Sequence, residues 1–411
     1  MRPLFFALLF FAWLPAVLEG STLTLSLAGS AGYTREHNPH LAAARLRIAE
    51  ARGRLLGAGR LPNPEAGLEF RSDRYGREGN LGVSLDQRFP VTSRLRLEKS
   101  LSRQLVAAAE LEVREQERLV IAEVQGLFVR LLALDQQRAL RDQQVQLARK
   151  LASFVGDRAG KGEISPLDAA QAEVDRQRLL LEVRKLDAER ITLLGELKPK
   201  LGVAATTRLS VSGTLPPPVP PGAGSWKERP DYQLARTREA AAVMQVDLAR
   251  AGRWDDLSAG AFWEMERSEE ERGLERTGFL GMRVSLPLPL WNQNQGEIAE
   301  KRAAAVRASL ETRALAVDIA GQVAAARAEM EVHARLATET RTQLLPLVAE
   351  QTDQLEKAYA SGQSDLLTLL RARDQKLQLE AAALEATRDF HLARIRYEAA
   401  TARHAPAARE K

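Results

Sequence analysis

The chain contains no cysteine among its 411 residues. This absence excludes disulfide bonds, metal sites built on thiolates, and the lipidated cysteine that begins bacterial lipoproteins. Aromatic residues are also scarce, at 5% of the chain. Alanine, leucine, arginine and glutamate dominate instead. This composition is typical of long helices and coiled coils.

Long apolar runs are missing beyond the N-terminus, where a transmembrane helix would need about 18 residues or more. The first 20 residues are typical of a secretory signal. Arg2 supplies the positive start, residues 4–18 are almost wholly apolar, and Gly20 is a small residue at the expected cut. An uncleaved anchor helix is the alternative, but the run is short and Pro15 interrupts it. We therefore predict export from the cytoplasm.

An excess of one charge sign is lacking as well, because 59 basic residues face 54 acidic ones for a net charge of +5. The two signs alternate along the chain and do not gather in one basic patch. Alternation of this kind is typical of solvated helix faces. We expect no nucleic acid partner.

The motifs of common enzymes are also missing, including His-Glu-x-x-His, a phosphate-binding loop and Gly-x-Ser-x-Gly. Gly160-Lys161-Gly162 lacks the other glycines of a phosphate loop, so we interpret it as a turn. His37 and His40 are the only close histidine pair, and a polar helix start explains them better than a metal site. The sequence predicts no enzyme, no cofactor and no bound metal.

The sequence pattern indicates two tandem copies of one unit. Asn38-Pro39 opens the first copy and Arg229-Pro230 the second. Each opening leads into two alternating stretches, a long apolar-periodic segment, a glycine turn and a returning helix. A period of about 200 residues is too long for a solenoid, whose periods run roughly 20–50 residues. The predicted parts are a signal peptide (1–20), a first repeat (21–202), a Pro-rich linker (203–228), a second repeat (229–403) and a C-terminal tail (404–411).

Apolar residues recur at every second position at 65–73, 80–90, 257–267 and 277–288. A half-buried soluble sheet shows the same alternation, but the remaining chain reads as helix and offers no partner sheet. We therefore predict the wall of a transmembrane barrel, apolar toward lipid and polar toward a water-filled lumen. The residues predicted to face the lumen are Glu69, Arg71, Asp86, Arg88, Glu264, Glu266 and Arg283.

Four strands cannot close a barrel, because transmembrane barrels have about eight strands or more. An open sheet edge leaves backbone groups without partners in lipid. We therefore expect several copies of the chain to share one barrel.

Two long apolar-periodic segments, from about Arg94 to Arg158 and from about Gln295 to Ala360, predict very long helices. At about 1.5 Å per residue each approaches 100 Å, and such helices bury their apolar stripe only against neighbours in a bundle. Both reverse at a glycine, Gly162 or Gly362, and return over 166–200 and 365–403. The predicted fold class is mostly α with a small β part.

Three segments carry a resemblance to a known family: Asn38-Pro39 with the helix after it, VSLPLPLWNQNQGEIAEKR at 284–302, and GEISPLDAAQAEV at 162–174. On these the chain resembles the TolC-type outer membrane factors, the exit ducts of tripartite efflux and type I secretion systems. The resemblance extends over essentially the whole mature sequence. The segment at 284–302 is most similar to the heavy-metal branch, which serves cobalt-zinc-cadmium or copper-silver exporters.

The resemblance implies a homotrimer in the bacterial outer membrane. Three chains would make a barrel of about 12 strands, continued in the periplasm by a long α-helical coiled-coil barrel. Its implied partners are a periplasmic adaptor (membrane fusion) protein, an inner membrane pump of the resistance-nodulation-division type, and outer membrane lipid. The implied function is a passive conduit, with heavy-metal ions as candidate cargo. A duct for type I protein secretion or multidrug efflux is one alternative, and a soluble periplasmic coiled-coil scaffold is another.

The resemblance also places functional positions at the two helix turns. The residues matching the adaptor-docking tips are Gly162, Ile164, Ser165, Gly362, Ser364 and Leu366. An entrance gate is expected at Asp168, Tyr359, Thr368 and Arg371. Tyr359 and Asp168 match positions that join two helix pairs, so a hydrogen bond between them would act as a latch; the alternative for Asp168 is a simple first-turn helix acid. Thr368 and Arg371 stand where many members carry carboxylates, which argues against an acidic entrance ring here.

Overall fold

The computed structural model describes residues 22–75, 78–163, 165–222, 224–270, 273–361 and 363–401. The predicted signal peptide (1–20), Ile164, Gly362 and the tail at 404–411 lie outside these residues. Contacts divide the chain into two compact units. We call them the tip unit (described residues within 22–38, 123–219 and 333–392) and the sheet unit (39–122, 220–332 and 393–401). Each unit combines segments of both predicted repeats.

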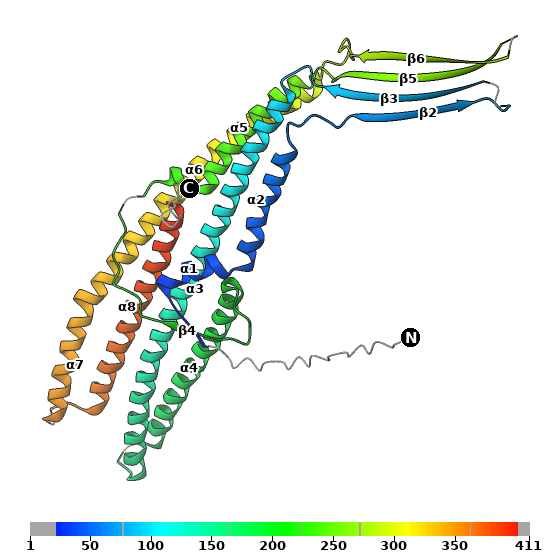
Figure 1. Cartoon of the computed structure of the whole chain (residues 1–411). Coiled ribbons are helices and arrows are strands. Elements are labelled where there is room, and N and C mark those ends of the chain that lie inside the picture. Colours follow the sequence, from blue (N-terminus) through cyan, green and yellow to red (C-terminus); the bar gives the residue numbers. More distant parts are fainter. Residues whose placement is uncertain are drawn as a thin grey trace, which may run out of the picture. The chain divides into compact units, whose positions relative to one another are not determined.

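The sheet unit contains a four-stranded antiparallel sheet with strand order β2-β3-β5-β6 (Figure 1). Its strands are β2 (Glu65–Ser72), β3 (Gly79–Phe89), β5 (Leu257–Glu270) and β6 (Gly273–Ser285). β5 and β6 reach closer to their shared turn than the predicted 257–267 and 277–288, because backbone pairing continues from Ser268↔Glu275 to Glu270↔Gly273. At its other end β6 stops at Ser285, shortly before Pro287, which cannot donate a ladder hydrogen bond.

Four helices of the chain adjoin this sheet in sequence: α2 (Pro39–Gly57) and α5 (Pro230–Ala251) each lead into a strand hairpin, and α3 (Arg94–Gly160) and α6 (Gln295–Glu339) each follow one. Pro39 and Pro230 stand at the first helical position, where a missing N–H has no consequence. The sheet unit buries an apolar core that includes Leu41, Ile121 and Ile319.

Asn38 and Arg229, which open the two repeats, are both buried but make different contacts. Within the tip unit, Asn38 Nδ2 donates to the Lys200 carbonyl at 2.6 Å. Within the sheet unit, Arg229 donates to both carboxylate oxygens of Asp231, at 3.0 and 2.6 Å. Burial pushes the pKa of Asp231 upward, but the hydrogen bond and charge of Arg229 outweigh it, so the pKa lies below its usual value.

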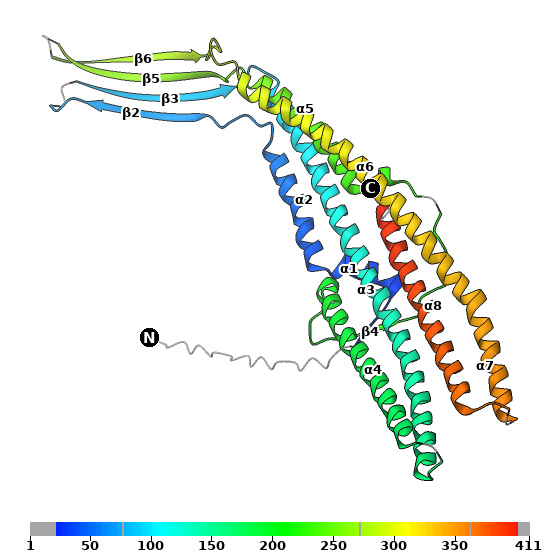
Figure 2. The same cartoon turned by 180° about the vertical axis from the view of Figure 1, so that it is seen from behind.

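In the tip unit, segments of four helices lie side by side in the order α4, α3, α8, α7 (Figures 1 and 2). These are α4 (Pro166–Leu201), α7 (Leu345–Ala360) and α8 (Leu366–Ala400) with the second part of α3. Charged and polar pairs cross each junction: Arg138–Asp187 at 2.6 Å between α3 and α4, Gln144–Asp374 at 3.4 Å between α3 and α8, and Glu356–Arg373 at 2.6 Å between α7 and α8. The prediction of a mostly helical chain with a small β part is confirmed.

The second long helix extends over 295–360 as predicted, but its α-helical hydrogen-bond pattern is interrupted. A π-helical turn, η2 (Thr340–Leu344), separates α6 from α7. Pro346 follows at the start of α7 and has no N–H to donate to residue 342, so the regular hydrogen-bond ladder fails there. Leu345 N–H bonds to the Thr340 carbonyl instead.

A short parallel strand pair in the tip unit was not predicted from the sequence. β1 (Thr22–Ser26) pairs with β4 (Arg208–Ser212), and α1 (Leu27–His37) follows β1 directly. β4 and the 3₁₀ turn η1 (Trp226–Glu228) lie inside the predicted linker 203–228, in which residues 203–207, 213–222, 224 and 225 are described without helix or strand. Five-residue strands carry too little alternation to be recognised alone. None of the helices formed by the described residues is long and apolar enough to cross a membrane.

Candidate channel wall and entrance

The sheet has one polar face and one apolar face. Residues directly opposite each other on neighbouring strands project from the same face. Glu65, Asp86, Gly260 and Arg283 are successive partners across the four strands and define the polar face. The same register brings together every polar position that the sequence assigns to a lumen: Glu69, Arg71, Asp86, Arg88, Glu264, Glu266 and Arg283.

The apolar face carries the other half of the alternation. Leu68, Val83, Trp263 and Leu280 form one row across it, and Phe70, Leu81, Met265 and Gly278 form the next. Leu280 is 83% exposed and Met282 is 85% exposed. An uncovered apolar surface of this kind is typical of a face that meets another protein or a membrane.

Charged residues on the polar face contact one another and an aromatic ring. Arg88 Nη2 lies 2.9 Å from Glu65 Oε1, and Arg71 Nη2 lies 3.0 Å from Glu69 Oε1. The Asn80 amide donates to Glu264. The guanidinium of Arg283 lies 5.4 Å from the centre of the Phe262 ring, a contact favourable to a cation.

Carboxylates outnumber guanidinium groups among the described side chains of this polar face. By register the carboxylates are Glu65, Glu69, Asp86, Glu264, Glu266 and Glu275. The guanidinium groups are those of Arg71, Arg88 and Arg283. A surface with this excess produces a negative potential and attracts cations.

Gly281 makes room for an aromatic ring on the polar face. It is the direct partner of Phe262, and a Cβ atom at position 281 would overlap the Phe262 ring. Gly278, one row away on the apolar face, has only the Trp263 indole nitrogen near its Cβ position, at 3.9 Å. A side chain at position 281 would therefore require the Phe262 ring to shift, whereas one at position 278 would not displace a neighbour.

The turn between α3 and α4 is built by a glycine and a serine. Gly162 has a φ of +77°, a conformation that residues with a side chain rarely adopt. Ser165 Oγ accepts a hydrogen bond from Leu167 N–H at 3.2 Å and so caps α4. Asp168 lies exposed in the first helical turn, as expected of a helix acid.

In the turn between α7 and α8, Asp365 immediately precedes the first residue of α8. Its carboxylate accepts a hydrogen bond from Thr368 N–H at 3.4 Å. The pKa of Asp365 lies below its usual value, chiefly because the Thr368 side chain bonds to the carboxylate and also because the charge of Arg371 is near. Ser364 is half-buried, whereas the side chain of Leu366 lies outside the described residues.

The four gate positions do not form a cluster in one chain. Among the described residues no hydrogen bond joins the Tyr359 hydroxyl to the Asp168 carboxylate, and the end of α7 lies apart from the start of α4 (Figure 1). Tyr359 is 40% exposed. Arg371 is exposed near Asp365, while Arg373 pairs with Glu356 at 2.6 Å. The hydrogen bond expected between Tyr359 and Asp168 is therefore not formed within the described residues of the chain.

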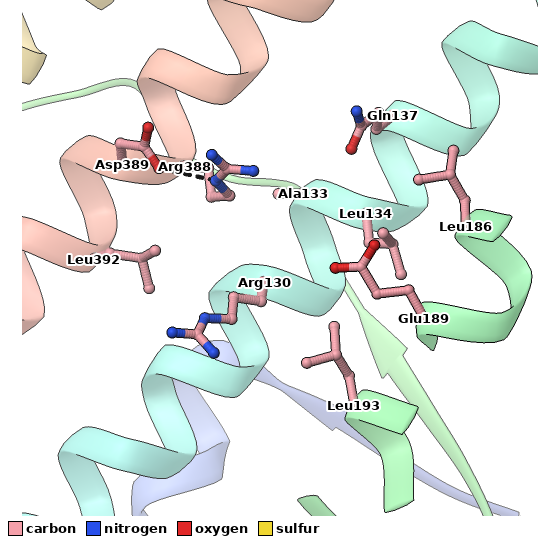
Figure 3. Close-up of a pocket in the computed structure, with 10 residues that line it drawn as sticks. All are labelled: Arg130, Ala133, Leu134, Gln137, Leu186, Glu189, Leu193, Arg388, Asp389 and Leu392. Carbon is pink, nitrogen blue, oxygen red and sulfur yellow. Dashed lines mark hydrogen bonds and ion pairs between the residues drawn. The ribbon is translucent and has the colours of Figure 1, made fainter. Parts of the chain in front are cut away.

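The structure also shows a cleft of about 500 Å³ in the tip unit that the sequence did not predict (Figure 3). Figure 3 shows the Arg388–Asp389 pair of α8 on one side and Leu134 of α3 with Glu189 of α4 on the other. The hydrogen bond to Asp389 raises the pKa of Arg388. These residues come from three different helices, so no local sequence pattern predicts the cleft. Within the described parts of the chain, no group of three or more His, Cys, Asp or Glu side chains could hold a metal ion.

Comparison with known proteins agrees with this architecture. The family of outer membrane efflux proteins matches residues 225–403. The pyoverdine export outer membrane protein OpmQ of Pseudomonas putida is 26% identical over 388 residues, covering 85% of this chain and 81% of OpmQ.

Two solved structures share the fold at low sequence identity. The outer-membrane channel OprN superposes with a TM-score of 0.74 at 18% identity, covering 91% of this chain and 89% of OprN. CusC, whose structures concern transmembrane channel formation, superposes with a TM-score of 0.73 at 16% identity, covering 91% of each chain. The two-faced sheet and the long helical hairpins agree with these likenesses of fold. Residues 225–403 thus match the family of outer membrane efflux proteins, and the chain has the fold of OprN and CusC.

Proposed function

We propose that three copies of this chain share one transmembrane barrel and form the exit duct of a tripartite efflux system. The observation that carries this proposal is the open sheet, with β2 and β6 at its edges and opposite chemistry on its two faces. In lipid the edge backbone groups must pair, so β6 of one copy bonds to β2 of the next. Three copies supply about 12 strands, an even number within the range of known barrels.

Crosslinking of edge strands tests the shared barrel. The chain has no native cysteine, so introduced cysteines are the only reactive thiols. We expect Leu68→Cys on β2 combined with Leu280→Cys on β6 to give covalent dimers and trimers with a flexible bismaleimide. The matched control is Leu81→Cys with Met265→Cys, direct partners inside the sheet, which should link within one chain. Edge-strand thiols that give only monomers would contradict the proposal.

The two turns of the tip unit are the proposed docking sites for a periplasmic adaptor. Gly162 and Ser165 on one turn and Ser364 on the other present little side-chain bulk, which lets another backbone approach closely. The duct is passive in this proposal, and an inner membrane pump of the resistance-nodulation-division type supplies the energy through the adaptor.

Site-directed crosslinking tests the docking sites. A thiol-reactive crosslinker at Ser165→Cys or Ser364→Cys should capture the adaptor in cells. The control is Arg178→Cys, on α4 away from the turn, where the native side chain is 78% exposed. Capture at position 178 and not at the turns would show that the adaptor docks along the helices.

The charges of the polar face favour the export of cations, including heavy-metal ions. Its excess of carboxylates concentrates cations near the wall of a narrow exit. In planar bilayers under a salt gradient, the reversal potential should show cation preference, and Glu264→Gln with Glu266→Gln should reduce it. Glu50→Gln, on helix α2, is the control and should leave the preference unchanged. An anion-selective channel would contradict this cargo assignment.

Export of another class of compound is the second candidate. OpmQ, similar over most of the chain, is named for pyoverdine export, and type I protein secretion or multidrug efflux remain alternatives. Deletion of the gene in its native host separates these candidates. Sensitivity to cobalt, zinc, cadmium, copper or silver salts supports metal efflux, whereas retained pyoverdine, drugs or a secreted protein supports the alternatives.

A further inference from the structure

Two arginines lie directly opposite each other on the apolar face of the sheet. Arg267 of β5 and Arg276 of β6 are partners in the strand register. Their row continues with Gly79 on β3 and Ser72 on β2. This row borders the turns that connect β2 to β3 and β5 to β6, and the row before it is the apolar one of Met265 and Phe70. The two guanidinium groups therefore end the apolar band.

This arrangement favours an anion close to the two guanidinium groups. Like charges directly opposite on paired strands repel each other. Among the side chains that the structure describes, neither Arg267 nor Arg276 forms an ion pair, whereas Arg71 and Arg88 of the polar face are each paired with a glutamate.

The position of the pair along the strand matches the outer boundary of a membrane. Arg267 follows Leu257, the first residue of β5, by ten positions. At about 3.4 Å per residue and a strand tilt of about 40°, this corresponds to a height of about 25 Å, which is the height of the apolar band of such barrels. Since the helical part is periplasmic, the strand turns lie toward the cell exterior and the pair lies at the outer leaflet.

We infer that Arg267 and Arg276 bind the phosphate group of a lipid in the outer leaflet. Arginine forms bidentate, charge-assisted hydrogen bonds with phosphate, and two arginines on adjacent strands enclose one such group from both sides. Met265 and Leu280, just below the pair on the same face, are placed to contact the acyl chains of that lipid. The inference rests on the membrane-spanning sheet of the proposed function and adds a bound lipid to it.

The test measures lipid binding to the purified full-length oligomer in detergent. Diphosphoryl lipid A, or the same lipid after removal of both phosphates, is added, and retained lipid is counted by mass spectrometry of the intact complex. Loss of charge-assisted hydrogen bonds should weaken binding of the dephosphorylated lipid by at least about tenfold. Arg267→Gln with Arg276→Gln should reduce retention of diphosphoryl lipid A to the level of the dephosphorylated lipid.

A matched control is available on the opposite face. Arg71→Gln removes a guanidinium from the neighbouring row, but from the polar face, and should leave lipid retention unchanged. Millimolar inorganic phosphate should not displace the lipid. Displacement by inorganic phosphate, or equal loss in Arg71→Gln, would reduce the site to a general anion effect and overturn the inference.

Other results would also overturn it. If the wild-type oligomer retains the two lipids equally, the inference is wrong. This result does not depend on whether a variant folds. If the double arginine variant dissociates the oligomer equally with either lipid, the arginines contact a neighbouring copy and not a lipid. A wild-type chain that forms no oligomer in any lipid would defeat the proposed function itself, whereas stable oligomers with equal lipid retention defeat only this inference.

Discussion

Arg94, in the first turn of α3, donates two hydrogen bonds to the carboxylate of Asp256, at 3.0 Å to Oδ1 and 2.7 Å to Oδ2. Asp256 immediately precedes β5, so the pair joins the end of the first strand hairpin to the start of the second. The side chains are 34% and 17% exposed, respectively. Partial burial makes this pair more important to stability than the exposed ion pairs of the helices.

Arg94→Ala should lower the free energy of unfolding by about 1–3 kcal/mol, because Asp256 would remain half-buried without its partner. Urea unfolding of the detergent-solubilised protein measures the change. The control is Arg54→Ala, which breaks the ion pair with Glu50, whose two side chains are 73% and 68% exposed. This change should leave the free energy of unfolding almost unaltered. If Arg94→Ala and Asp256→Asn prove additive in the double variant, the two residues do not interact energetically.

Gly281→Ala should impair folding of the sheet, because the new methyl group would overlap the Phe262 ring. We expect less heat-resistant oligomer on unboiled gels and recovery when Phe262→Leu is added. Gly278→Ala on the apolar face is the matched control and should behave as wild type, since its methyl group meets only an ordinary contact. A Gly281→Ala protein with normal oligomer yield would show that the ring moves freely.

Tyr359→Phe with Asp168→Ala should raise single-channel conductance in planar bilayers if these residues form a latch between chains. Either single change removes the same hydrogen bond, so each should raise conductance about as much as the double variant. Unchanged conductance in all three variants would leave Asp168 with the role of a helix first-turn acid.

The start of α4 should lose stability in acid. Arg176 donates two hydrogen bonds to Glu173, and these bonds lower the pKa of Glu173 from 4.5 to about 2. Because the folded pKa is depressed, the stabilisation is fully present above pH 4.5 and is lost as the pH falls toward about 2.

Melting temperatures measured against pH check this expectation. The difference between wild type and Glu173→Gln should be largest above pH 4.5 and should disappear on acidification toward pH 2. The effect should be small, because water screens this exposed pair. Glu196→Gln, at an exposed position of the same helix, should show no such pH dependence. If the difference in melting temperature is the same at every pH, the charge of Glu173 does not contribute to stability.

Much of the fold could be predicted because its signals are local. The period-two alternation at residues 65–73 and 80–90 reports one apolar and one polar strand face, and the structure forms strands there. The glycine and serine at positions 162 and 165 predict a turn and a new helix through backbone conformation and capping alone. The docking and gate roles of these turns came from the resemblance and stay predictions, because a single chain does not contain the contacts that would test them.

Sequence alone determined the class of secondary structure, the polar and apolar faces of each strand and the turns of the helical hairpins, since each depends on residues a few positions apart. Only the tertiary structure decided that β3 neighbours β5, that β1 pairs with β4, and that Arg130, Glu189 and Arg388 line one cleft. It also decided the register that sets Arg267 opposite Arg276. These relationships depend on how strands align and helices pack, because packing and register bring together residues that no local pattern connects.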